Sequence, residues 1–353
     1  MFLFICFILA FFIALCVNKF FLRNNFTFFI KKQNIASKRF ATQPKPIFGG
    51  IAFFTVFVFI IIIMLFTNKL YMHLPAEFIA LLLIGIIAFS MGIADDILQT
   101  RPHVKILMQM VCCIILLFSD IYIQVSPYMF LNWVITFFWV VGIMNSINML
   151  DNMDTVSTMV TLSIFCGIIF YTLIFGSVLL EFEIFILVAL SAALLCFLFF
   201  NWHPAKMYMG DNGSQFLGVI LAYFGIRFFS ASIDIVKYSF GVNTIQLIIV
   251  ILAFIIPISD TTTVVINRLL KKTSPFKGDK NHTTHHLFYL GIPIRYIGII
   301  LFVVNLIGVF LSLFLIHNFY LIKTSQYFLF LIYPITVFLL LYINTKLSKE
   351  KNI

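Results

Sequence analysis

The chain has 353 residues, of which 62% are hydrophobic and only 10% are charged, and its mean hydropathy is +1.10. This composition excludes a soluble domain with a polar surface and indicates an integral membrane protein. The net charge of +10 is expected at a membrane surface, where it orients the protein and attracts anionic lipid. Because no soluble domain is available to carry it, nucleic-acid binding is not expected.

Apolar runs of roughly 17 to 25 residues follow one another along the chain, each long enough to cross a hydrocarbon layer of ~30 Å as a helix. No alternation of polar and apolar residues suggests a transmembrane barrel. We therefore expect an all-α, polytopic transmembrane helix bundle of about 11 helices, with 10 or 12 as alternatives, in a single integral membrane domain over residues 1–353. The runs lie near residues 1–22, 48–67, 77–94, 103–119, 127–145, 156–176, 182–200, 215–231, 245–267, 294–316 and 326–344.

The first run is expected to be retained as a helix with its N-terminus outside. Unlike a signal peptide, it has no basic segment before its apolar core, and its cations, Lys19 and Arg23, follow that core. With crossings alternating from this start, 19 of the 23 Lys and Arg residues fall on one face and four on the other. An excess of cations marks the cytoplasmic face, so the C-terminus is expected in the cytoplasm.

The connections on the outer face show no grouping that suggests chemistry. Their acidic residues are expected to be solvated loop or interface charges, namely Glu77, Asp120, Glu181, Glu183 and Asp234. The six cysteines all fall within apolar runs and lack CxxC spacing. They are expected to be small core residues, neither disulfides nor metal ligands.

The cytoplasmic connections, in contrast, hold nearly every unusual cluster of polar residues. Five of them, distant in sequence, converge on one side of the membrane, which is how a helix bundle builds a site at one membrane face. We therefore expect the active site to be formed by the cytoplasmic segments 38–50, 95–105, 145–155, 201–214 and 268–287.

The first of these segments, 38–50, contains two prolines that forbid a continuous helix and two glycines that permit close approach of the backbone. A simple turn would also explain these four residues. Lys45, held within this frame, is a candidate for phosphate contact.

The second segment places two adjacent carboxylates, Asp95 and Asp96, at the end of one helix and Lys105 near the start of the next, which Pro102 opens. A carboxylate costs roughly 2.5–3.5 kcal/mol at the centre of a membrane helix and less near its end, so two together need a compensating cation. An ordinary salt bridge to Arg101 and Lys105 is the alternative to a functional site.

In the third segment, Asn148, Asp151 and Asp154 recur every three residues, so they would share one face if the segment were helical. A polar ridge between apolar helices is hard to explain as packing, although a helix cap would explain Asp154 alone. In the fourth segment, Asp211 lies between Gly210 and Gly213. It is either an N-cap or a carboxylate presented where a ligand comes close to the backbone.

The fifth segment adds Arg268 and three histidines, His282, His285 and His286. Zinc is a weak alternative here, because the spacing matches no ordinary structural site and no thiolate is nearby. A cationic, hydrogen-bonding cradle for phosphates fits these residue types better. Asp260, about two turns inside its helix, is either an ion-pair partner or a pocket wall.

Acidic residues from three segments and cations from the others suit a divalent cation that holds a polyphosphate. Mg²⁺ prefers oxygen ligands and commonly takes one or two carboxylates plus substrate phosphates. Phosphoryl transfer needs mainly positioning and neutralisation of charge. A site at the membrane surface suits a polar phosphate donor from the cytoplasm and a lipid acceptor that arrives sideways.

These segments together resemble the polyprenyl-phosphate N-acetylhexosamine-1-phosphate transferase family, of the glycosyltransferase family 4 type. Its members move a sugar-1-phosphate from a UDP-sugar to undecaprenyl phosphate and release UMP. The resemblance runs from Lys38 to Leu287 through five ordered motifs: Pro44 to Gly50, Asp95 to Lys105, Asn145 to Asp154, Pro204 to Ser214, and Arg268 to His286.

The resemblance implies a Mg²⁺-dependent enzyme, with Mn²⁺ as the alternative ion, whose catalytic residues are Asp95, Asp96 and Asp211. Asp211 would be a metal ligand, together with Asp96 and Asp154, and Asp95 would bind or deprotonate the lipid phosphate. Nucleotide or metal contacts are implied for Asn148, Asp151 and Asp154, and pyrophosphate contacts for Arg268, His282, His285 and His286. We favour direct attack by the lipid phosphate over a covalent enzyme intermediate.

Three departures from the family pattern leave the donor sugar and the individual histidines unassigned. Ala41 stands where the family usually has His, and Asn152 and Thr155 stand where it has glycines. An extra Thr separates His282 from His285.

The number of helices and the basic C-terminus resemble the undecaprenyl-phosphate GlcNAc-1-phosphate transferase branch, which starts O-antigen lipopolysaccharide, teichoic acid or capsule. The alternative is the phospho-N-acetylmuramoyl-pentapeptide transferase of peptidoglycan synthesis. The alternative from a different class of protein is a membrane transporter. It would need charges near the midplane of several helices, whereas the carboxylates here cluster at one membrane face. The expected location is the bacterial cytoplasmic membrane, and the expected partners are a UDP-sugar, undecaprenyl phosphate and membrane lipid, with a homodimer left open.

Overall fold

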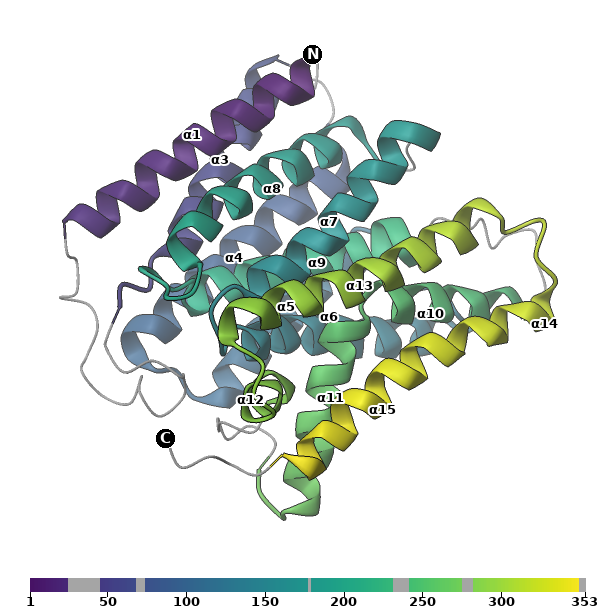
Figure 1. Cartoon of the computed structure of the whole chain (residues 1–353). Coiled ribbons are helices and arrows are strands. Elements are labelled where there is room, and N and C mark those ends of the chain that lie inside the picture. The colour runs from purple at the N-terminus through teal and green to yellow at the C-terminus, as the bar shows by residue number, and fades with distance from the viewer. Residues whose placement is uncertain (25–44, 68–73, 177–178, 231–240, 275–281, 349–353) are drawn as a thin grey trace.

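The structure is a computed structural model that describes residues 1–24, 45–67, 74–176, 179–230, 241–274 and 282–348 (Figure 1). These residues form helices and no strands. The helices are α1 (Phe2–Arg23), α3 (Gly49–Thr67), α4 (Ala76–Leu98), α5 (Pro102–Phe118), α6 (Met129–Leu150), α7 (Val156–Phe175), α8 (Glu181–Asn201), α9 (Asp211–Phe224), the π-helix η3 (Gly225–Ser230), α10 (Gly241–Ala253), α11 (Ile255–Leu270), α12 (Thr283–Tyr289), α13 (Ile294–His317), α14 (Thr324–Tyr327), the 3₁₀ helix η5 (Phe328–Leu331) and α15 (Ile332–Leu347).

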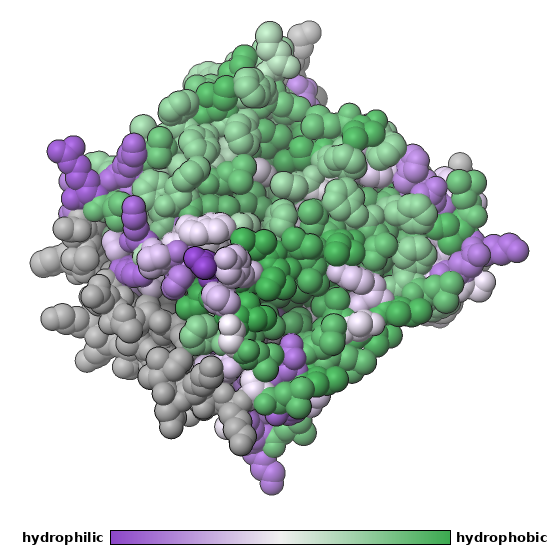
Figure 2. Space-filling view, in the orientation of Figure 1, coloured by the Kyte–Doolittle hydropathy of each residue, from purple (hydrophilic) through white to green (hydrophobic). Residues whose placement is uncertain are grey.

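Each of the predicted apolar runs contains a helix, which confirms an all-α, polytopic bundle. Among the described residues, nine helices are long and apolar enough to cross a membrane, and the bent pair α10 and α11 makes ten. The remaining run forms α5, an apolar helix of 17 residues. Apolar side chains cover the broad middle of the face in Figure 2, and hydrophilic ones gather toward its ends. The direction in which the chain crosses the membrane stays a prediction.

Helix α9 is the centre of the bundle, since every residue from Asn212 to Phe224 is buried. It packs mainly against α4 and α6, and small residues allow this close packing, as is common between membrane helices. A Cβ at Gly92 of α4 would lie 2.4 Å from the Cα of Asn212, and one at Gly218 of α9 would lie 2.8 Å from the Cα of Met144. The start of α9 is therefore fixed against its neighbours.

The apolar run near residues 245–267 is broken, although its hydropathy predicts a single crossing. Helices α10 and α11 meet at Phe254 with a bend of 86°. Pro257 has no N–H and disfavours a continuous helix through this point. The buried Asn305 of α13 accepts a hydrogen bond from the Ile256 N–H at 3.1 Å and donates one to the Ala253 carbonyl at 3.1 Å. Asn305 thus satisfies backbone groups that the break leaves without helical partners.

At the opposite end of the bundle from the start of α9, Glu183 is fully buried, so the expectation that it is a solvated or interface charge is wrong. Arg227 Nε donates to Glu183 Oε1 at 3.0 Å, and the Tyr223 hydroxyl donates to the same oxygen. The backbone N–H of Leu180 donates to Oε2 at 2.7 Å. Glu183 lies in the first turn of α8, near the end of an apolar run, where a solvated charge is also possible. The sequence therefore did not reveal the three donors that surround this carboxylate.

Candidate active site

The carboxylate of Asp96, at the end of α4, caps the N-terminus of α9. Oδ1 accepts the N–H of Asp211 at 2.9 Å, and Oδ2 accepts the N–H of Asn212 at 2.9 Å and a bond from its side-chain amide. The residue that precedes α9 is Gly210, which has no side chain to act as a cap. Helix N-termini leave N–H groups unsatisfied and favour negative charge, so Asp96 supplies from α4 the cap that α9 lacks.

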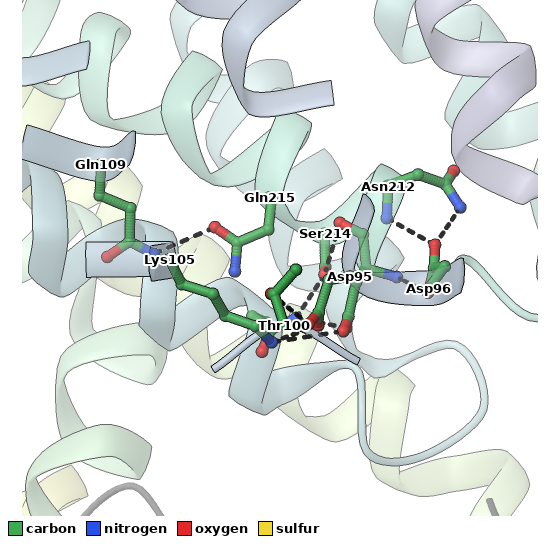
Figure 3. Close-up of polar contacts among 10 residues, drawn as sticks. Asp95, Asp96, Thr100, Lys105, Gln109, Asn212, Ser214 and Gln215 are labelled. Atoms are coloured by element: carbon green, nitrogen blue, oxygen red, sulfur yellow. Dashed lines mark hydrogen bonds and ion pairs between the residues drawn. The ribbon is translucent and has the colours of Figure 1, made fainter. Parts of the chain in front are cut away.

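The start of α9 and the end of α4 meet Lys105 of α5 in one charged cluster (Figure 3). Lys105 Nζ forms an ion pair with Asp95 Oδ2 and lies 3.6 Å from Asp211 Oδ2. Thr100 donates its hydroxyl to Asp95 Oδ1 at 2.6 Å. Asp95 is 7% exposed, whereas Asp211 is 31% exposed. The salt bridge between Asp95 and Lys105 that the sequence allowed is therefore present. The same Lys105 also approaches Asp211, which belongs to a segment more than a hundred residues later.

Asn148, near the end of α6, contacts the same cluster from the other side. Its Nδ2 donates to Asp211 Oδ1 at 2.7 Å and lies 2.8 Å from Ser214 Oγ. Asp211 thus has a cation at one oxygen and an amide at the other, while part of its carboxylate stays exposed. The structure brings together Asp95, Lys105, Asn148 and Asp211, four of the residues that the sequence singled out.

A row of amides behind this cluster was not predicted. Asn145 Nδ2 donates to Gln109 Oε1 at 2.8 Å, and Gln109 Nε2 donates to Gln215 Oε1 at 3.1 Å. Gln109 and Gln215 are both fully buried, and Figure 3 shows their amides beside Lys105. A signal was available, because a glutamine within an apolar run is costly in a membrane and usually has a specific partner.

The other two members of the predicted polar ridge lie off the helix. Helix α6 ends at Leu150, so Asp151 and Asp154 follow it in turns and do not share a helical face with Asn148. Asp154 Oδ2 lies 2.7 Å from His203 Nδ1 and accepts the Ala205 N–H at 3.1 Å. Its contacts therefore join the segment after α6 to the segment before α9.

Thr155, which stands where the family pattern has a glycine, has a left-handed backbone with φ of 69°. This conformation is unfavourable for a β-branched residue. The surrounding structure holds it, since Asn201 Oδ1 accepts the Thr155 N–H at 2.8 Å and Asn201 Nδ2 donates to the Met207 carbonyl at 3.0 Å.

The first predicted segment packs beside the fourth. Tyr208 N–H donates to the Pro46 carbonyl at 2.8 Å, and the Asn212 amide donates to the Ile47 carbonyl at 3.0 Å. Lys45 Nζ lies 5.4 Å from the centre of the Tyr208 ring, within the range of a cation–π contact. Lys45 is thus close in space to the loop that leads to Asp211, while residues 38–44 lie outside the described part.

The predicted histidines lie on and just before the short helix α12, and Asp260 of α11 contacts its start. Asp260 Oδ1 accepts the Thr283 N–H at 3.0 Å, and Oδ2 lies 3.2 Å from His282 Nδ1. Asp260 is therefore an ion-pair partner of His282 when that ring is protonated. Arg268 is buried at the other end of α11, and residues 275–281 lie outside the described part.

The carboxylates offer few open ligands for a metal ion. In Asp96 both oxygens accept N–H donors of α9, and in Asp154 one oxygen is bonded to the 203–205 segment. Among the described residues, no group of three or more His, Cys, Asp or Glu could hold a metal. Mg²⁺ needs less than that, because it commonly binds one or two carboxylates and keeps waters and substrate phosphates. The partly exposed Asp211 fits this requirement best.

Residues 78–229 match the family model described as glycosyl transferase family 4. This part of the chain is therefore similar to glycosyl transferase family 4. The matched segment contains the cluster of Asp95, Lys105, Asn148 and Asp211 and ends before α11 and α12.

The chain is also similar to three named transferases, of which it spans less than two thirds of the length in each case. It is 30% identical over 230 residues, 63% of its length, to the probable undecaprenyl-phosphate N-acetylglucosaminyl 1-phosphate transferase of Bacillus subtilis, of which it covers 61%. It is 32% identical over 199 residues, 50% of its length, to the phospho-N-acetylmuramoyl-pentapeptide-transferase of Clostridium perfringens, of which it covers 59%. It is 29% identical over 161 residues, 43% of its length, to the decaprenyl-phosphate N-acetylglucosaminephosphotransferase of Mycolicibacterium smegmatis, of which it covers 39%.

Proposed function

We propose that this protein transfers a sugar-1-phosphate from a UDP-sugar to undecaprenyl phosphate and releases UMP. The observation that carries the proposal is the partly exposed carboxylate of Asp211, which Lys105 and Asn148 contact at the end of an apolar helix bundle. The names of the relatives from Bacillus subtilis and Mycolicibacterium smegmatis support N-acetylglucosamine as the transferred sugar.

In the proposed reaction, an oxygen of the lipid phosphate attacks the phosphorus that carries the sugar, and the bond from that phosphorus to the oxygen of UMP breaks. Asp211 would hold Mg²⁺, which supplies charge neutralisation for the diphosphate when bound. Mn²⁺ is the alternative ion.

The protein's own residues would position the two phosphates. Lys105 is 22% exposed and would contact the lipid phosphate, while Asp95 and Thr100 hold Lys105 and its neighbourhood in place. Such positioning lowers the barrier because the reactants meet already oriented. Asp96 would act by fixing the start of α9, and so the direction of Asp211.

The polyprenyl chain of the acceptor needs an apolar surface next to these charges. A pocket between α6, α10 and α11 is lined mainly by apolar side chains, among them Phe138, Trp139, Val250 and Ile258. Because the same helix α6 carries Asn148 near its other end, the pocket would hold part of the lipid chain while its phosphate reaches Lys105.

A second candidate function is phospho-N-acetylmuramoyl-pentapeptide transfer, which the similarity to the Clostridium perfringens enzyme favours. Both candidates use the same chemistry and the same lipid, and they differ in the sugar. The test is UMP release by the purified full-length chain with Mg²⁺, undecaprenyl phosphate and either UDP-GlcNAc or UDP-MurNAc-pentapeptide. Release from UDP-GlcNAc alone supports the first function, release from the other donor alone supports the second, and release from neither contradicts both.

The proposed location is the bacterial cytoplasmic membrane, with the site facing the cytoplasm. Lys206 is exposed in the segment before α9, so a cysteine introduced there should react with an impermeant maleimide only in inverted vesicles. Labelling in intact cells would contradict this orientation.

A further inference from the structure

Helix α12 is only seven residues long, yet contacts from three directions hold it. At its start, Asp260 of α11 contacts His282 and Thr283. In its first turn, the Thr284 hydroxyl donates to Asn152 Oδ1 at 2.7 Å. Further along, His286 Nδ1 contacts the Ser348 hydroxyl just after α15. Such a short helix would be unstable alone, so these contacts determine where its histidines lie.

The bond between Thr284 and Asn152 joins α12 to the candidate active site. Asn152 follows the end of α6, and its own Nδ2 donates to the Met149 carbonyl at 2.7 Å. Asn148, which contacts Asp211, lies in the same last turn of α6. Asn152, which departs from the family pattern, is therefore the hydrogen-bond partner of Thr284, one of the two threonines between His282 and His285, and this contact fixes α12 relative to the last turn of α6.

Of the three contacts, the one made by Asp260 is the most costly in free energy to lose, because the carboxylate of Asp260 is 0% exposed. A buried carboxylate is costly unless it is paired and hydrogen-bonded. Thr283 supplies two donors to Oδ1, and His282 is the ion-pair partner of Oδ2 among the described residues. The environment of Asp260 thus requires the His282 ring.

The contact with Asp260 determines which nitrogen of the His282 ring carries a proton. A carboxylate can only accept, so His282 Nδ1 must carry a proton where it meets Oδ2. The ring nitrogen left for a ligand is then Nε2, whose direction follows from the Asp260 contact. A carboxylate behind an imidazole commonly sets its tautomer and orientation in this way.

We propose that Asp260 is a positioning residue that, through His282, directs Nε2 of that ring at a diphosphate oxygen of the nucleotide-sugar donor. This inference rests on the proposed function and extends it to the donor side of the site. When the ring carries its second proton, Nε2–H donates to the phosphate oxygen and Asp260 is the counter-charge. Asp260 itself does not touch the substrate.

The test compares Asp260→Asn with Thr283→Val in the full-length protein, each alone and with His282→Gln. Asparagine keeps an acceptor for the Thr283 N–H but offers an amide N–H to His282. Valine removes one donor to Asp260 and leaves the contact with His282. Charge-assisted hydrogen bonds contribute enough for Asp260→Asn to raise the KM for the UDP-sugar about 10- to 100-fold, with much smaller changes in kcat and in the KM for the lipid. Thr283→Val should lower the unfolding temperature and leave the KM for the donor near its original value.

Two further results distinguish positioning from a structural effect. In the His282→Gln background, Asp260→Asn should raise the donor KM no further. In ¹⁵N-histidine spectra of the protein in nanodiscs, the Nδ1 signal that His282→Gln removes should move toward the unprotonated range in Asp260→Asn and stay in place in Thr283→Val. An equal KM increase in both backgrounds, or an unchanged Nδ1 signal, would overturn the proposal. The spectra need no turnover, so they separate failure of this inference from failure of the proposed function, which the absence of UMP release would show.

Discussion

At the scale of single residues, the carboxylates at the ends of α4 and α9 differ in what their oxygens touch. Asp96 is bonded to backbone N–H groups, Asp95 to Lys105 and Thr100, and Asp211 to a side-chain amide with Lys105 nearby. Of the two carboxylates that contact Lys105, that of Asp211 is more exposed to solvent than that of Asp95. Removal of each negative charge should therefore have a different consequence.

Asp211→Asn should lower Mg²⁺-dependent UMP release by about 100-fold or more, because it removes the proposed ligand of the ion, and the ion's neutralisation of charge in the transition state contributes an effect of that size. The control is Asp120→Asn, the same change at an exposed position at the other end of the bundle, which should leave turnover unchanged. Turnover and Mg²⁺ dependence are measured together. Undiminished activity of Asp211→Asn would exclude Asp211 as the metal ligand.

Asp96→Asn should act mainly on stability. An amide cannot accept at both positions, so one N–H at the start of α9 loses its acceptor, at a cost of about 1–3 kcal/mol. We expect a lower unfolding temperature and reduced turnover, with an unchanged Mg²⁺ concentration for half-maximal activity. If that concentration rises while the unfolding temperature stays constant, Asp96 is a metal ligand, as its motif implied.

The sequence was sufficient to select the residues of the cluster but not their contacts. Carboxylates and cations beside apolar helices are expensive, so Asp95, Lys105 and Asp211 stand out. Which oxygen meets which donor depends on how α4 and α9 approach each other, and spacing along the chain carries no such information. Gln109 and Gln215 were missed for a similar reason, since a single uncharged amide within an apolar run is a weaker signal than a charge.

At the scale of helices, hydropathy predicted the elements well because a backbone in lipid must satisfy its hydrogen bonds internally. The break between α10 and α11 was not predicted, since proline is tolerated within membrane helices when neighbours satisfy the freed groups. The neighbour here is Asn305 of α13, a polar residue in another apolar run. Its role depends on a contact between helices that no single run reveals.

Thr155 and Gly298 of α13 provide a test of how strain in one segment depends on a neighbouring helix. A Cβ at position 298 would lie 2.2 Å from Thr155 Oγ1, whereas one at Gly142 of α6 would meet no atom within 4 Å. Gly298→Ala should therefore lower stability by about 1–3 kcal/mol, the usual cost of overpacking, and Gly142→Ala should have little effect. In a Thr155→Gly background the clash is absent, so Gly298→Ala should be close to neutral.

The measurement for this pair is the unfolding temperature of the four combinations at positions 155 and 298 in one detergent. Thr155→Gly alone should be no less stable than the original chain, because glycine adopts the left-handed conformation without strain. Equal destabilisation by Gly298→Ala in both backgrounds would show that the two positions are not coupled.

At the scale of the whole molecule, groups of charged and polar residues lie at both ends of the helices α4 and α9. One end holds the candidate active site, and the other holds Glu183, Arg227 and Tyr223, with Glu77 4.0 Å from Arg227. Helices α4 and α9 contribute residues to both groups. The contacts of the second group therefore fix how these two helices lie against α8. The sequence suggested solvated charges there because it could not show that Glu183 turns inward.

Glu183→Gln should lower stability by about 3–5 kcal/mol, since removal of one partner leaves Arg227 without its buried counter-charge. Glu183→Gln combined with Arg227→Gln should recover much of this loss, because neither charge is then buried alone. The matched control is Glu181→Gln, the same change two residues earlier at an exposed position, and it should be neutral. Unfolding temperatures give the stabilities, and the KM for the UDP-sugar should stay the same in all three variants, because these residues lie at the other end of the bundle. A double variant no more stable than Glu183→Gln would mean that Arg227 gains nothing from the ion pair, and that Tyr223 and the Leu180 N–H alone account for the buried Glu183.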